Sequence, residues 1–122
     1  MLLMDGASDD LGPSGTVTAP KPPCEGPRTV LRRPFKVEKG FAVVADLPQF
    51  QDVADAVEFP AYSTLILCED KKPLGPPHSD HDDIRGKGLG RYSHWNGYLI
   101  FSASDNSDPQ TNMHEYTVRV RR

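Results

Sequence analysis

The sequence has 122 residues, of which 37% are hydrophobic and 25% are charged, and its formal net charge is −3. This length suffices for one domain with a single modest core. A net negative chain lacks the positive charge that neutralises phosphates, so we expect no nucleic acid partner. No apolar run approaches the roughly 20 residues that span a bilayer, so we expect no membrane insertion.

The N-terminal part of the chain does not predict a core. Residues 1–27 are rich in Gly, Pro, Ser, Thr and Asp, a composition that buries too little apolar surface to offset the entropy of ordering. We therefore expect a disordered N-terminal tail at 1–27 and a single β-rich domain at 28–122. The brief apolar start lacks the regions of a secretory signal, which predicts a cytoplasmic protein.

The two cysteines, Cys24 and Cys68, lie in unlike contexts and lack the spacing of a zinc or redox motif. Cys68 ends an apolar run, so we expect a small buried hydrophobic residue there. A disulfide between the two would require an oxidising compartment. The sequence leaves open whether they pair.

Short strand-like runs begin near Thr29. Apolar residues recur with strand-like spacing at 29–31, 35–37 and 41–45. Residues 46–59 have helical spacing, but Pro48 and Pro60 bracket them and limit any helix to about one to three turns. Residues 64–68 are apolar on both faces, as expected for a central strand buried from both sides.

A short helix is predicted before the next strand. Ser79 and Asp82 have the spacing of a capping box, Ile84 would face the core, and Gly86 or Gly88 would end the helix after about two turns.

The strongest local signal is Asn96-Gly97, which favours a two-residue type I′ turn between strands at 91–95 and 98–104. This turn pairs Trp95 with Tyr98 and His94 with Leu99. One face of the hairpin then carries Tyr92, His94, Leu99, Phe101 and Ala103 toward the core. The other carries Arg91, Ser93, Trp95, Tyr98, Ile100, Ser102 and Ser104.

A final strand at 116–121 alternates apolar and polar residues. These runs together predict a mostly β fold. We expect an antiparallel β-sandwich or rolled sheet of about five to seven strands with one short helix.

The second face of the hairpin combines aromatic rings, a cation and hydroxyls, which suit stacking on a planar or sugar-like ligand. Alternatively, Trp95 and Tyr98 only stabilise the hairpin. The loop Asp105–Asn112 would either bind a ligand or be held by Asx turns, and its spacing does not match an EF-hand. The candidate ligand-binding residues are Arg91, Ser93, Trp95, Tyr98, Asp105, Asn106, Asp108 and Asn112.

Three histidines, His78, His81 and His94, lie near carboxylates, but their spacing does not place them securely on one helical face for zinc. We expect structural polar roles for His78, His81, Arg85 and His94, and we expect the last three to make contacts between the short helix and the hairpin. Ser93 and His94 are neighbours on a strand and point to opposite faces, so they cannot form a catalytic dyad. We expect no catalytic residue, metal or cofactor.

Within residues 65–112, the stretch LILCEDKKPLGPPHSDHDDIRGKGLGRYSHW is followed shortly by YLIFSASDNSDPQTN. This block resembles a short module found with bacterial glycosyltransferases and sugar methyltransferases of surface-glycan synthesis. The shared parts are Glu69-Asp70, Pro73-Leu74-Gly75, His78, His81, Ile84-Arg85, Gly90-Arg91, Ser93-His94-Trp95 and 104–112. The chain departs from the module at Lys71, where a turn glycine is expected, and at Met113-His114, where a Gly-Arg pair is expected.

The resemblance implies a glycan context and a glycosyltransferase or methyltransferase as partner. Together with the aromatic hairpin face, it predicts a non-catalytic accessory domain that binds a carbohydrate or glycan precursor in bacterial glycan synthesis. Two alternatives stay open: a glycan-modifying enzyme that uses His and Asp chemistry, and a protein-interaction module.

Overall fold

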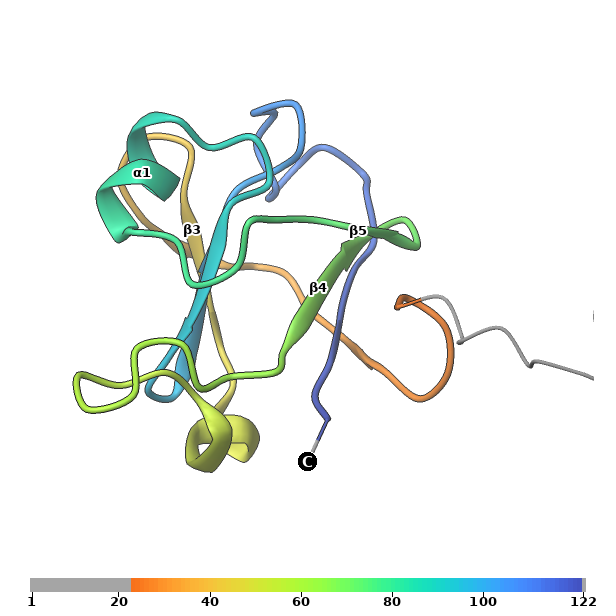
Figure 1. Cartoon of the computed structure of the whole chain (residues 1–122). Coiled ribbons are helices and arrows are strands. Elements are labelled where there is room, and N and C mark those ends of the chain that lie inside the picture. Colours follow the sequence, from red (N-terminus) through yellow and green to blue (C-terminus); the bar gives the residue numbers. More distant parts are fainter. Residues whose placement is uncertain (1–22, 122) are drawn as a thin grey trace, which may run out of the picture.

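The computed structural model describes residues 23–121 as two four-stranded antiparallel sheets (Figure 1). The first sheet has the order β1 (Thr29–Val30), β8 (Tyr116–Arg119), β4 (Ile66–Glu69) and β5 (Lys72–Pro73). The second has the order β2 (Lys36–Val37), β3 (Val43–Asp46), β7 (Tyr98–Phe101) and β6 (Tyr92–Trp95). The expected mostly β fold with one short α-helix is confirmed. Eight strands exceed the expected number because the two-residue strand β5 has no apolar periodicity that would predict it from the sequence.

The main core contains residues from both sheets. Leu67, Leu99, Phe101, Tyr116 and Val118 are each at most 1% exposed. Phe101 packs edge-on against Phe35, and its ring centroid lies 5.1 Å from that of Tyr116. These side chains alternate along their strands, so each strand contributes one face to the core.

The hairpin register is confirmed. Trp95 pairs with Tyr98, His94 with Leu99 and Tyr92 with Phe101. β3 pairs with the edge of β7 that does not pair with β6, so β7 is a central strand of the second sheet. β4 lies between β8 and β5, which confirms a central position for the run at 64–68.

The short helix α1 (His81–Gly86) ends as expected, but its N-cap is Asp80 and not Ser79. The Asp80 side chain accepts a hydrogen bond from the backbone N–H of Asp82, whereas the Ser79 hydroxyl donates to the carbonyl of Pro76. The helix docks through Ile84, which is fully buried with Ala42 and Ile100 in a second small cluster. Part of the hairpin face expected to be accessible is therefore covered. The segment at 46–59 contains a 3₁₀ helix, η1 (Pro48–Val53), followed by a loop.

A disulfide joins Cys24 to Cys68, so the segment before β1 is covalently attached to β4. Cys24 is 2% exposed, and Arg119 donates to the carbonyls of Pro23 and Glu25. Attachment to the domain therefore begins N-terminal to the expected boundary at residue 28, while tail residues 1–22 lie outside the described residues. No helix within 23–121 is both long and apolar enough to cross a membrane.

Lys71 and Met113 adopt the left-handed backbone conformation that glycine favours. Lys71 has φ +70° in the turn between β4 and β5, and Met113 has φ +69°. Such a conformation costs a residue with a Cβ atom roughly 1–2 kcal/mol. Lys71 and Met113 are therefore held with local backbone strain.

Loss of the disulfide should lower the free energy of unfolding by about 4 kcal/mol, because the bond closes a loop of 44-residue separation in the unfolded chain. Urea unfolding of the protein with and without reductant measures this difference. The Cys24→Ala variant should match the reduced protein and show no response to reductant. Coincident unfolding curves for the oxidised and reduced protein would contradict the prediction.

Replacement of Lys71 by glycine should stabilise the protein by about 0.5–1 kcal/mol, because relief of left-handed strain exceeds the entropy that glycine adds to the unfolded chain. Urea unfolding is the measurement, with Lys72→Gly as the matched control. Lys72 lies in β5 and is not among the residues with positive φ. Replacement of Lys72 by glycine should destabilise the protein. A Lys71→Gly protein that unfolds at a lower urea concentration than the wild type would refute the explanation by backbone strain.

Candidate functional site

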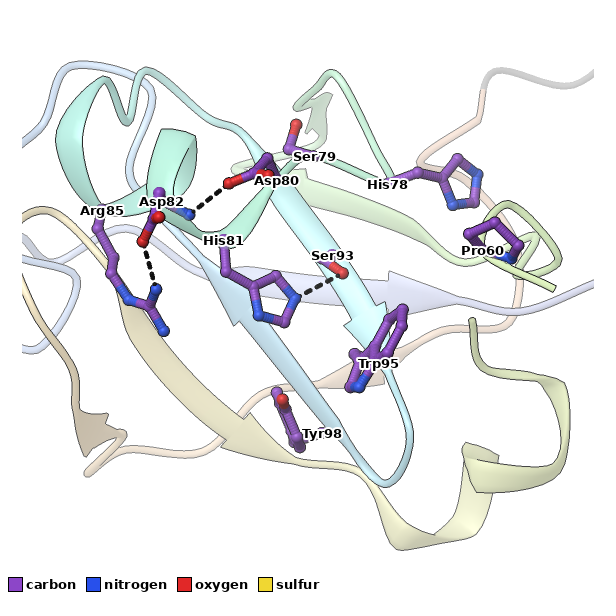
Figure 2. Close-up of a pocket in the computed structure, with 10 residues that line it drawn as sticks. All are labelled: Pro60, His78, Ser79, Asp80, His81, Asp82, Arg85, Ser93, Trp95 and Tyr98. Atoms are coloured by element: carbon purple, nitrogen blue, oxygen red, sulfur yellow. Dashed lines mark hydrogen bonds and ion pairs between the residues drawn. The ribbon is translucent and has the colours of Figure 1, made fainter. Parts of the chain in front are cut away.

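A pocket of about 460 Å³ lies beside the hairpin, between helix α1 and the loop that follows η1 (Figure 2). The helix contributes His81, Asp82 and Arg85, and the hairpin contributes Ser93, Trp95 and Tyr98. Pro60, His78, Ser79 and Asp80 complete the lining. The pocket therefore joins three segments that are separate in the sequence: the loop with Pro60, residues 78–85 and the hairpin.

The aromatic part of the pocket is formed by Trp95, Tyr98 and the imidazole of His81. The His81 ring lies edge-on to Trp95 at 5.8 Å and to Tyr98 at 6.4 Å between centroids. Trp95 and Tyr98 are only half-buried. Trp95 and Tyr98, the cross-strand pair predicted from the turn, therefore pair within the hairpin and also form a wall of the pocket.

The floor of the pocket is polar. His81 Nε2 lies 3.2 Å from the Ser93 hydroxyl, which ties α1 to β6. Burial lowers the pKa of His81, and the nearby Arg85 guanidinium lowers it further. Arg85 itself pairs with Asp82 at 2.8 Å and with Glu38 at 3.3 Å, so it contacts the helix and the segment before β3 and not the hairpin.

A buried carboxylate, Asp55, holds one side of the pocket in place. Asp55 is 1% exposed and accepts hydrogen bonds from the Ser63 backbone N–H at 2.7 Å and from His78 Nδ1 at 2.5 Å. The His78 side chain is 28% exposed and lines the pocket. Because Nδ1 is engaged by Asp55, Nε2 is the ring nitrogen that a ligand can reach.

Sequence reasoning missed Asp55 and Ser63. Asp55 follows a segment with helical spacing, where an acidic residue is ordinarily solvent-exposed. In the structure its backbone N–H donates to the carbonyl of His94 at 2.8 Å, and its carbonyl accepts from Asn96 at 3.2 Å. This bridge to β6 is a long-range contact for which the local sequence contains no signal.

His94 makes its contacts inside the protein. Its Nδ1 lies 2.6 Å from the Ser63 hydroxyl, which also accepts from the backbone N–H of Leu65. The Ser63 hydroxyl therefore links the His94 imidazole to the backbone of Leu65. Burial lowers the pKa of His94, while the Asp55 carboxylate and the Phe50 backbone act in the opposite direction.

The structure does not bring the remaining predicted ligand-binding residues to this pocket. Arg91 donates to the carbonyl of Gly88 at 3.0 Å. Asn106 and Asp108 line a separate, smaller hollow of about 280 Å³ that also contains Phe41. Of the predicted set, only Ser93, Trp95 and Tyr98 share the main pocket.

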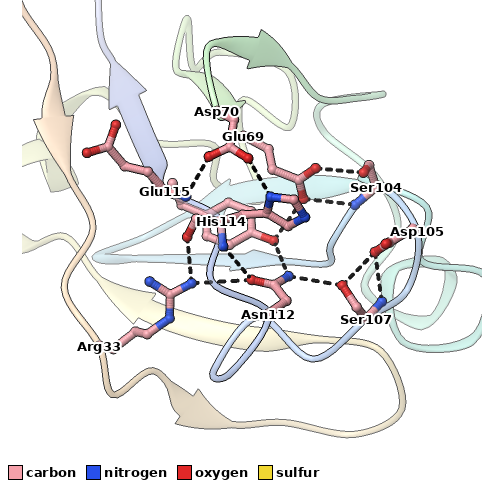
Figure 3. A network of polar contacts seen from close by, with 10 residues as sticks. Arg33, Glu69, Asp70, Ser104, Asp105, Ser107, Asn112, His114 and Glu115 are labelled. Atoms are coloured by element: carbon pink, nitrogen blue, oxygen red, sulfur yellow. Dashed lines mark hydrogen bonds and ion pairs between the residues drawn. The ribbon is translucent and has the colours of Figure 1, made fainter.

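The loop Asp105–Asn112 is held by its own side chains (Figure 3). Asp105 accepts from the backbone and hydroxyl of Ser107, and Asp108 accepts from the backbone N–H of Gln110. The Asn106 carbonyl accepts from Leu89 N–H at 2.7 Å, and Asn112 donates to the Tyr116 hydroxyl at 2.8 Å. Each candidate side chain of the loop therefore has a partner within the protein.

The Asn112 contact continues into a buried network. The Tyr116 hydroxyl donates to Glu69 at 2.8 Å, and the Ser104 hydroxyl donates to the same carboxylate at 2.6 Å. At the surface nearby, His114 pairs with Asp70, which raises the pKa of His114. Within residues 23–121, no group of three or more His, Cys, Asp or Glu side chains is arranged to hold a metal ion.

Comparisons of the chain with protein families, curated proteins and solved structures find no match. The chemistry of the site is therefore inferred from its geometry.

The protein should lose stability as the pH falls from about 7.5 to about 5.5. Burial lowers the pKa values of His81 and His94 below the value of 6.5 expected when unfolded. The unfolded chain then binds more protons in this range, so acidification favours unfolding. His114 acts in the opposite direction, because its raised pKa adds stability below 6.5 that is lost as the pH rises.

Melting temperatures across this range check the prediction. The decrease in melting temperature between about pH 7.5 and about pH 5.5 should be smaller in the His94→Gln protein and larger in the His114→Gln protein than in the wild type. A melting temperature that rises toward pH 5.5 in the His114→Gln protein would show that the buried histidines do not govern the pH dependence.

Proposed function

We propose that this domain is a non-catalytic carbohydrate-binding module and that the pocket between α1 and the hairpin is its binding site. The observation that carries the proposal is the half-buried pair of Trp95 and Tyr98 beside polar side chains held in fixed positions. Sugar rings present an apolar face of C–H groups and a rim of hydroxyls, which match an aromatic wall with hydrogen-bonding groups around it.

The polar groups are preorganised by contacts with one another and with carboxylates of the protein. Asp55 orients His78, Ser93 faces His81, and Arg85 is held by two carboxylates. Such groups lose little conformational entropy when a ligand binds. The pocket volume of about 460 Å³ also falls within the range of about 300–1,000 Å³ that is usual for ligand sites.

The disulfide bears on where the module acts. A bond between Cys24 and Cys68 is expected to persist in an oxidising compartment and not in the cytoplasm. We therefore favour a location outside the cytoplasm over the cytoplasmic location expected from the sequence. The proposed glycan context and the glycosyltransferase or methyltransferase partner rest on the resemblance of residues 65–112.

A second candidate function is a glycan-modifying enzyme, and the Asp55–His78 pair favours it. A buried carboxylate on Nδ1 fixes the tautomer of a histidine and leaves Nε2 to accept a proton from a hydroxyl or a water. The pair serves equally well as an oriented hydrogen-bonding group for a bound sugar. The fate of the glycan after incubation distinguishes the two functions.

A glycan array of the intact protein, followed by titration calorimetry, tests the binding proposal. Trp95→Ala should weaken binding at least about fivefold, because aromatic stacking contributes about 1 kcal/mol or more. Trp95→Phe should retain most of the affinity. Phe41→Ala is the matched control, because Phe41 is a partly exposed aromatic residue on the separate smaller hollow.

The proposal fails if the wild-type protein binds no glycan or if Phe41→Ala weakens binding as much as Trp95→Ala. A bound glycan whose mass is altered by the wild-type protein, but not by His78→Gln, would instead support the enzyme.

A further inference from the structure

Two aromatic side chains next to the pocket are not packed into the core. Phe59 is 65% exposed and Tyr62 is 56% exposed, and their ring centroids lie 6.0 Å apart. Val57, on the same loop, is 79% exposed. Neighbouring apolar side chains left in water typically mark a surface that binds something.

The loop that carries these rings is anchored at both ends. Asp55 is hydrogen-bonded to β6 through its backbone, and its carboxylate accepts from the backbone N–H of Ser63. Between these points, Ala56 and Phe59 exchange backbone hydrogen bonds at 3.2 and 3.0 Å. The exposure of the two rings is therefore a consequence of a loop whose ends and turn are fixed by hydrogen bonds.

The loop adjoins the aromatic wall of the pocket. Asp55 forms a bridge with Trp95, and Pro60, which lies between the two aromatic residues in the sequence, lines the pocket (Figure 2). In Figure 1 this loop, drawn in yellow-green, and helix α1 project from the same side of the molecule. The Phe59–Tyr62 pair is therefore carried by the same short loop that contributes Pro60 to the lining of the pocket.

We propose that Phe59 and Tyr62 form a second sugar-binding subsite and that the ligand is an oligosaccharide or polysaccharide chain. This inference rests on the proposed carbohydrate-binding function. One sugar unit occupies the pocket against Trp95 and Tyr98, and the chain leaves the pocket over Pro60 to stack on the exposed pair. Aromatic rings suit this role because they offer a large apolar face at little cost in side-chain entropy.

Titration calorimetry with a size series tests the second subsite. The probes are mono-, di-, tetra- and hexasaccharides of glucose, mannose, galactose and rhamnose. The wild-type protein should bind hexasaccharides of the preferred sugar at least about fivefold more tightly than the monosaccharide, because stacking on the second pair adds about 1 kcal/mol or more.

The double variant Phe59→Ala/Tyr62→Ala should lose this gain with chain length while its monosaccharide affinity is unchanged. Trp95→Ala should weaken binding at every length. Met113→Ala, which removes a side chain that is 93% exposed elsewhere on the surface, is the control and should behave as wild type. The double variant should keep the wild-type melting temperature, because both rings lie largely outside the core.

Equal affinity of the wild-type protein for the monosaccharide and the hexasaccharide would overturn the second subsite and leave the carbohydrate-binding function in place. Loss of monosaccharide binding in a folded double variant would assign the two rings to the first subsite. If the wild-type protein binds none of the probes, both proposals fail. Binding of another protein that the double variant abolishes would then assign the pair to a protein interface.

Discussion

The arrangement of the pocket depends on the burial of one carboxylate. Removal of a charged group from water costs several kcal/mol unless hydrogen bonds and charges compensate. Asp55, at 1% exposure, is compensated by the Ser63 backbone and by His78, while its own backbone is bonded to β6. These contacts fix the loop 56–62 against the hairpin and orient a histidine toward the pocket. Without them, the pocket would lose the side that Pro60 and His78 form.

The second determinant is the register of the β6–β7 hairpin. Because side chains alternate along a strand, the two-residue turn at Asn96-Gly97 decides which residues face the main core and which face α1. Leu99 and Phe101 enter the main core, whereas Ser93, Trp95 and Tyr98 line the pocket. The helix is too short to be stable alone and docks through Ile84 on the same face. The pocket is the part of that face that the helix leaves uncovered.

Polar residues that look equally functional in the sequence have different roles in the structure. The loop Asp105–Asn112 is dense in groups that suit a ligand, yet those groups satisfy one another, the backbone and the buried Tyr116–Glu69 pair (Figure 3). Short Asn, Asp and Ser side chains readily bond nearby backbone, so local composition does not distinguish a binding loop from a self-supported one. The side chains that line the main pocket come instead from elements brought together by docking.

The sequence by itself determined the fold class, the hairpin register, the existence of a short helix with Ile84 inward, and the shared face of Trp95 and Tyr98. These features follow from local rules: the spacing of apolar residues, the preference of Asn-Gly for a two-residue turn, and the proline and glycine residues that end helices. Only the tertiary structure decided that Asp55 is buried against His78, that Cys24 reaches Cys68, and that Arg91 lies apart from the pocket. Each of these depends on contacts between residues far apart in the chain. Their energy comes from desolvation and packing in the assembled fold, which no window of local sequence encodes.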